Sequence, residues 1–145
     1  MEPLDLLKLD NQLCFALYST SHALTKAYAP LLERLGLTYP QYLVMLVLWE
    51  GDRITVKAVG ERLHLDSGTL TPLLKRLETI GLVRRERDKR DERQVRISLT
   101  EAGHALRQQA VEVPYGIACA VGLPLDRIMA LKAELEAVRA ALLAE

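Results

Sequence analysis

One stretch of the sequence, residues 65–78, limits the fold of this chain more than any other. Asp66 is expected to begin a helix there, because its carboxylate can accept hydrogen bonds from the first free backbone N–H groups. Leucines recur at steps of three and four residues and form one apolar face, made of Leu70, Leu73, Leu74 and Leu77. The opposite, polar face carries Ser67, Thr69, Thr71, Lys75 and Arg76. The pattern predicts a short helix with one buried side and one exposed side.

The polar face of this helix suits a DNA groove, since hydroxyl groups can bond base edges and cations can bond phosphates. We assign Thr69 and Thr71 to base edges. The residues expected at DNA on this helix are Ser67, Thr69, Thr71, Pro72, Lys75 and Arg76. The alternative interpretation is an ordinary amphipathic surface helix.

The residues on either side of this helix complete a recognisable motif. A short strand at Ile54 and a helix from Thr55 to about Leu63 are predicted before it, and the turn at residues 64–65 makes a helix-turn-helix. Strand-like stretches at 82–87 and 94–99 follow and enclose a charged tip. We expect this hairpin to act as a wing, with Arg90 or Arg93 reaching DNA and Asp91 bracing a neighbouring arginine. A hairpin that is merely solvated is the alternative.

Charge is unevenly distributed although the net charge is zero. Residues 1–50 hold 3 basic and 5 acidic side chains, residues 51–100 hold 12 and 8, and residues 101–145 hold 4 and 6. A basic middle with acidic ends is typical of a DNA-facing core whose flanking segments do not touch DNA.

The flanking segments are predicted to be helical. We expect helices over about 6–35, interrupted or kinked at Pro30, over 38–50, over 101–121 with a kink at Pro114, and over 125–143. The expected fold is mainly α with a small β-hairpin wing, in one domain of residues 1–145. The winged helix-turn-helix core is 37–100, and the helices of 1–36 and 101–145 form a homodimer. Two recognition helices then require a pseudo-palindromic site.

Several classes of protein are disfavoured. No apolar run has membrane-spanning length and the N-terminus lacks the pattern of a secretory signal, so a cytoplasmic protein is expected. The two cysteines, Cys14 and Cys119, are too few for a disulfide scaffold and lack metal-ligand spacing. We expect no metal and no cofactor. His22, His64 and His104 are scattered and are interpreted as surface or turn residues.

The order of these elements resembles the MarR family of winged-helix repressors. The resemblance rests on Asp88-x-Arg90-Asp91-x-Arg93, followed by Leu99-Thr100-x-x-Gly103. Further motifs resemble the organic hydroperoxide sensor branch of that family: residues 11–15, 37–42, 65–72 and 91–93. The resemblance covers essentially the whole chain.

The resemblance implies that Cys14 is the peroxide-reactive thiol, that Tyr28 and Tyr39 hydrogen-bond it, and that Tyr18 lies nearby. It also implies that Cys119 is a resolving thiol, and we expect an intersubunit disulfide between Cys14 and the partner's Cys119. Without the resemblance, a lone cysteine in an apolar helix is usually an inert core residue, and Cys119 a small residue in a tightly packed helix. Apolar neighbours are expected to favour organic hydroperoxides, namely Phe15, Leu17 and Met45.

Three functions follow from these patterns. The first is a DNA-binding repressor that organic hydroperoxide switches off. The second is a MarR-type repressor released by a small lipophilic or phenolic effector, with structural cysteines. The third, a thiol peroxidase, is disfavoured because no Cys-x-x-Cys and no histidine beside a cysteine is present.

Overall fold

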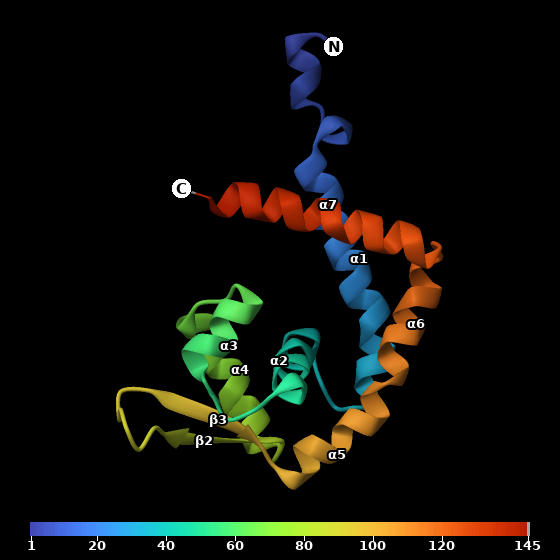
Figure 1. Cartoon of the computed structure of the whole chain (residues 1–145). Coiled ribbons are helices and arrows are strands. Elements are labelled where there is room, and N and C mark those ends of the chain that lie inside the picture. The colour runs from blue at the N-terminus through green and yellow to red at the C-terminus, as the bar shows by residue number, and fades with distance from the viewer. Residues whose placement is uncertain (145) are drawn as a thin grey trace.

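The computed structural model describes residues 1–144, a mainly helical chain with one small sheet (Figure 1). The elements, in chain order, are the 3-10 turns η1 (Pro3–Leu7) and η2 (Leu9–Asn11), α1 (Leu13–Glu33), α2 (Tyr39–Glu50), β1 (Ile54–Thr55), α3 (Val56–Leu63), α4 (Ser67–Thr79), β2 (Val83–Arg87), β3 (Val95–Leu99), α5 (Glu101–Ala110), α6 (Glu112–Val121) and α7 (Leu125–Leu143). Residues 39–99 form the predicted winged helix-turn-helix, and the remaining helices extend from it.

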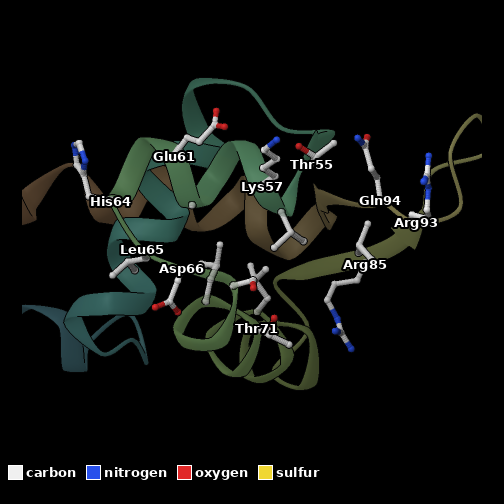
Figure 2. Close-up of a pocket in the computed structure, with 16 residues that line it drawn as sticks. Thr55, Lys57, Glu61, His64, Leu65, Asp66, Thr71, Arg85, Arg93 and Gln94 are labelled. Atoms are coloured by element: carbon white, nitrogen blue, oxygen red, sulfur yellow. The ribbon is translucent and has the colours of Figure 1, made fainter. Parts of the chain in front are cut away.

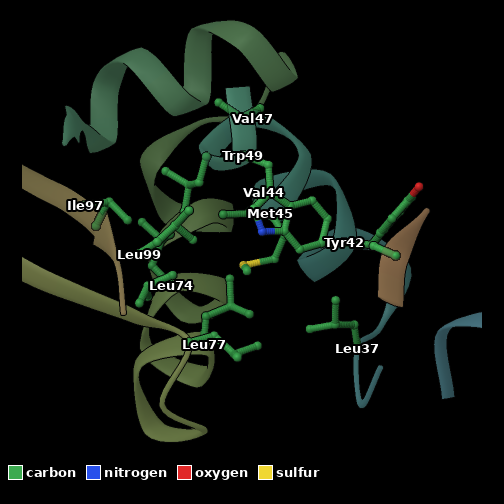
Figure 3. Packing of buried hydrophobic residues seen from close by; sticks show 14 of the residues in the cluster. Leu37, Tyr42, Val44, Met45, Val47, Trp49, Leu74, Leu77, Ile97 and Leu99 are labelled. Carbon is green, nitrogen blue, oxygen red and sulfur yellow. The ribbon is translucent and has the colours of Figure 1, made fainter. Parts of the chain in front are cut away.

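Helix α2 is the centre of the core, as its uniformly apolar sequence predicts. The predicted capping box is present: the backbone N–H of Gln41 donates to Thr38 Oγ1, and the backbone N–H of Thr38 donates to Gln41 Oε1 at 3.0 Å. Figure 3 shows Val44 and Met45 of α2 among leucines of α4 and the inner residues of β3. Burial of this helix therefore supports both the recognition helix and the wing.

The sheet has the strand order β1-β3-β2, and both pairings are antiparallel. Val83 lies opposite Leu99, and Arg85 lies opposite Ile97. Because side chains alternate across a strand, these residues share the inner face, while Arg84 and Arg96 lie on the outer face. The register thus divides the arginines of the wing between two faces.

The N-terminal helix begins later than predicted. Residues 3–11 form two 3-10 turns, and α1 starts only at Leu13. Side-chain bonds to the backbone compete with helix formation here, because Asn11 Nδ2 donates to the Asp5 carbonyl at 2.8 Å. Of the two effects predicted for Pro30, an interruption of the helix does not occur, since α1 continues through it to Glu33. Gly36 ends the segment in the left-handed region, as expected, with φ +70°.

The predicted helix over 101–121 is two helices that meet at Val111. Pro114 has no backbone N–H to donate to the carbonyl of Ala110, four residues before it, so the chain turns there. The break falls one turn earlier than the proline itself. In Figure 1, α5 follows the wing strands while α6 runs beside α1.

Helix α7 crosses α1 and leaves much of its predicted apolar face exposed. Leu131, Leu135, Val138 and Leu142 all retain substantial accessible surface in the single chain. Leucines of η1 and η2 are exposed too. None of the helices within residues 1–144 combines the length and apolar character needed to cross a bilayer.

Candidate nucleic-acid interface and thiol sites

Helix α4 presents its polar side to solvent, as predicted. Asp66 caps the helix and accepts a bond from the Thr69 backbone N–H at 2.8 Å. This bond holds the pKa of Asp66 below its usual value. Leu70, Leu74 and Leu77 are buried under the helix. The exposed residues on the other side are Ser67, Thr69, Pro72, Lys75 and Arg76.

Thr71 is less exposed than these residues, and its assignment to a base edge stays a prediction. It is half-buried and lines a cavity of about 780 Å³ between α3, α4 and the wing (Figure 2). The reason is its angular position: at 100° per residue, Thr71 points between the leucine face and the outer face. Of the two threonines expected at base edges, Thr69 is the one that projects outward.

The turn between α3 and α4 depends on close backbone approach. His64 adopts a left-handed conformation with φ +57°, and the chain folds back on Gly60. A Cβ atom at Gly60 would lie 2.7 Å from the Leu65 carbonyl oxygen. A glycine is therefore needed for α4 to pack at this angle, and the hydrophobic pattern contained no signal of that requirement.

The wing presents its arginines in different ways. Arg85 is tied to α4, because its backbone N–H donates to Glu78 Oε2 at 3.0 Å and its guanidinium contacts Glu78 Oε1 at 3.2 Å. At the tip, Asp91 braces Arg93 with an Nε–Oδ1 distance of 3.1 Å, as predicted. Within residues 1–144 no ion pair involves Arg90. Arg90 and Arg93 are thus exposed cations at the tip.

Cys14 lies in the first turn of α1 and is exposed. Because α1 begins at Leu13, the free N–H groups of a helix N-terminus surround this residue, and Gln12 makes no side-chain cap. Tyr18 is one turn away, but its ring is 64% exposed and lies against His22 at 4.5 Å. The predicted neighbour Met45 lies in the core instead.

Tyr28 and Tyr39 are brought together, but not at the Cys14 of their own chain. Their ring centroids are 4.6 Å apart, and Tyr42, which the sequence did not single out, completes the cluster at 5.9 Å from Tyr28. Tyr28 is fourteen residues after Cys14, or about 21 Å along the axis at 1.5 Å per residue. Within one chain these hydroxyls cannot hydrogen-bond the thiol.

Cys119 lies on α6 and is also exposed. Helix α6 runs antiparallel to α1 (Figure 1), and a Cβ atom at Gly116 would lie 2.8 Å from Leu31. Three residues beyond Gly116, Cys119 is therefore at about the level of Tyr28 on α1. A disulfide needs Cα atoms roughly 4.4–6.8 Å apart, so Cys14 and Cys119 of one chain cannot form one in this conformation.

Burial raises the pKa of Tyr28 to about 12, with repulsion from Tyr39 and Tyr42 as the smaller cause. The unfolded chain then loses its tyrosine proton first, so this contribution to stability is complete below pH 10 and disappears between pH 10 and 12. We expect the free energy of unfolding to fall there by at most about 2.7 kcal/mol on account of Tyr28. Urea unfolding at a series of pH values between about 9 and 12 measures this fall in the free energy of unfolding.

Tyr28→Phe should flatten this fall at alkaline pH. Tyr115→Phe is the matched control, since that ring is 72% exposed and lies outside the cluster. Equal pH profiles for wild type and Tyr28→Phe would contradict the assignment.

The fold and the exposed faces of α4 and the wing define a class, the winged-helix transcriptional regulators. A family model described as "Transcriptional regulator SarA/Rot" matches residues 26–109. The chain belongs to this family, and within the wider MarR group to the organic hydroperoxide resistance branch that its motifs resemble.

Individual relatives agree with this membership. The organic hydroperoxide resistance transcriptional regulator of Bacillus subtilis (strain 168) is 58% identical over 110 residues, which cover 76% of this chain and 75% of that protein. The regulator TtmR of Methylorubrum extorquens (strain PA1) is 53% identical over 131 residues, which cover 90% of this chain and 67% of that protein.

AbfR of Staphylococcus epidermidis has been solved in several states. Reduced AbfR bound to DNA is 40% identical, with a TM-score of 0.79 over 99% of this chain and 100% of that chain. AbfR with its disulfide formed is 39% identical and has a TM-score of 0.64, over 93% of this chain and 95% of that chain.

Proposed function

We propose that this chain is a homodimeric repressor that binds a pseudo-palindromic DNA operator and releases it when an organic hydroperoxide oxidises Cys14. One observation carries the redox part of the proposal: the two exposed thiols lie near opposite ends of α1, and the tyrosine cluster is level with Cys119. A partner chain arranged antiparallel along α1 would bring its Cys14 close to Cys119 and to the tyrosine cluster at the same time.

On DNA, the exposed front of α4 enters the major groove, with Ser67 and Thr69 at base edges. Lys75 and Arg76 bind phosphates, and Arg90 or Arg93 at the wing tip reaches the minor groove. In a two-fold dimer the two helices read half-sites about 34–36 Å apart. The exposed leucines of residues 1–11 and α7 supply the dimer contacts.

At the thiol, the Cys14 thiolate attacks the terminal oxygen of the hydroperoxide. The O–O bond breaks, Cys14 becomes a sulfenic acid and the alkoxide takes a proton to leave as alcohol. The partner subunit's Tyr28 and Tyr39 donate hydrogen bonds to the sulfur. A tyrosine whose pKa is raised by burial remains a donor throughout the neutral range. The thiol of the partner's Cys119 then displaces water and forms the disulfide.

Two tight contacts suggest how the disulfide acts on DNA binding. Trp49 Nε1 donates to the Gly103 carbonyl at 2.9 Å, so α5 is attached to the DNA-binding core, while α6 is attached to α1 through Gly116 and Leu31. The chain bends between them at Val111. We therefore propose that the boundary between the DNA-binding and dimerisation parts lies at Val111. A disulfide at Cys119 would then displace α6 and rotate the DNA-binding part relative to the dimerisation part.

The AbfR comparisons support a change of conformation between the two redox states. The chain is more similar to the reduced, DNA-bound form than to the disulfide form, by TM-scores of 0.79 and 0.64. In this proposal the protein acts in the cytoplasm and is not an enzyme, because each oxidation is one signal and is not followed by turnover.

The resolving role of Cys119 has a direct test. After treatment with cumene hydroperoxide, we expect a covalent dimer on a non-reducing gel, which a thiol reductant returns to monomer. Cys119→Ser should abolish that dimer, because Cys14 then lacks its resolving partner. The matched control is Ala118→Ser, which adds a hydroxyl to the neighbouring exposed position. Persistence of the covalent dimer in Cys119→Ser would contradict the pairing.

A further inference from the structure

A buried carboxylate stands at the start of the wing loop. Asp88 is only 8% exposed, although most of the loop around it is open to solvent. It accepts a bond from the Arg90 backbone N–H at 2.8 Å and another from Arg96 Nε at 2.8 Å. Its own backbone N–H donates to the Gln94 carbonyl at 2.8 Å. Both sides of the loop are therefore held at Asp88.

Arg96 extends this contact to the body of the domain. Its Nη1 donates to the Arg53 carbonyl at 2.7 Å. Arg53 adopts a left-handed conformation with φ +64°, and its own N–H bonds the Ile97 carbonyl at 2.7 Å. One guanidinium thus joins the wing loop to the segment just before β1, forty-three residues away in sequence.

The arginines of the wing therefore differ in what their side chains bind. Arg96 has two of its three nitrogens committed to the protein and lies on the outer face of the sheet, opposite Glu86. Arg90 and Arg93 lie at the tip, and each has its backbone N–H bonded to an aspartate two residues earlier. Asp88, which accepts the bond from Arg96, also accepts the bond from the Arg90 backbone at the tip.

We propose that Arg96 is a positioning residue for DNA binding: through Asp88 and the Arg53 carbonyl it sets the wing so that Arg90 and Arg93 reach DNA, and it makes no phosphate contact itself. The inference rests on the proposed DNA-binding function. It predicts a loss of affinity that disappears when Arg90 and Arg93 are also removed, because Arg96 then has no DNA-contacting side chain to position.

The experiment compares Arg96→Gln with Arg84→Gln in the full-length dimer, using operator duplex at several salt concentrations. Arg84 is an exposed arginine on the same outer face, and within residues 1–144 no ion pair involves it. Both changes remove one positive charge. We expect Arg96→Gln to weaken binding about tenfold and Arg84→Gln less than about twofold, with the wild-type salt slope kept in Arg84→Gln. Lys75→Gln, the contact control, should flatten the slope by about one unit.

A second measurement asks whether Arg96 acts through the tip. In a background with Arg90→Gln and Arg93→Gln, adding Arg96→Gln should cost less than about twofold, since no side chain remains to be positioned. A full tenfold loss in that background would overturn the inference. Absence of operator binding by the wild-type dimer would overturn the proposed function itself and the inference with it.

Discussion

Replacing Cys14 with serine is expected to leave a repressor that binds its operator normally and no longer releases it when organic hydroperoxide is added. The side chain is exposed in the first turn of α1, so the change of one atom disturbs no buried packing. The hydroxyl cannot form a sulfenic acid, so neither the first oxidation nor the disulfide can occur. Oxidation of the wild type should weaken operator binding at least tenfold, or about 1.4 kcal/mol.

Fluorescence anisotropy with a labelled operator, before and after cumene hydroperoxide, measures this difference. The variant should change less than about twofold across the same treatment. If Cys14→Ser is released as readily as the wild type, the sensor is elsewhere. In that case a small effector that binds without covalent chemistry becomes the better explanation.

Replacing Gly103 with alanine is expected to destabilise the protein by at least about 3 kcal/mol. The new Cβ would lie 2.2 Å from the Leu82 carbonyl oxygen and 3.1 Å from Leu99 Cδ2, and the first of these atoms is backbone and cannot move aside alone. The carbonyl of Gly103 also accepts the buried Trp49 bond. Helix α5 would have to shift away from the core, and urea unfolding would record the loss.

Gly68→Ala is the matched control, because Gly68 also lies in the first turn of a helix. There the nearest atom to a new Cβ is Asp66 Oδ1 at 3.4 Å, an ordinary contact. Alanine has the higher helix propensity, so this variant should be unchanged or up to about 1 kcal/mol more stable. A stable Gly103→Ala protein would show that α5 is not held to the core as described.

Much of the winged core was predictable, because its signals are local. The caps at Thr38 and Asp66 act on N–H groups within three residues, and both were found where expected. The apolar run of α2 identified a buried helix without knowledge of its neighbours. The predicted helix ends were wrong at residues 3–11 and at Val111. At the first, side chains bond to backbone carbonyls of the preceding turn, and at the second, a proline lacks the N–H that the helix needs.

The candidate sites were likewise predictable only in part. The sequence by itself determined which residues are chemically able to act: two thiols, a polar-faced helix and a basic hairpin, since residue types and short spacings encode these. Only the tertiary structure decided how they combine. It brought Tyr28 together with Tyr39 and Tyr42 from the next helix. It turned Thr71 toward a cavity and committed Arg96 to Asp88 and a distant carbonyl. These outcomes depend on contacts between segments far apart in the chain, which periodicity along one element does not encode.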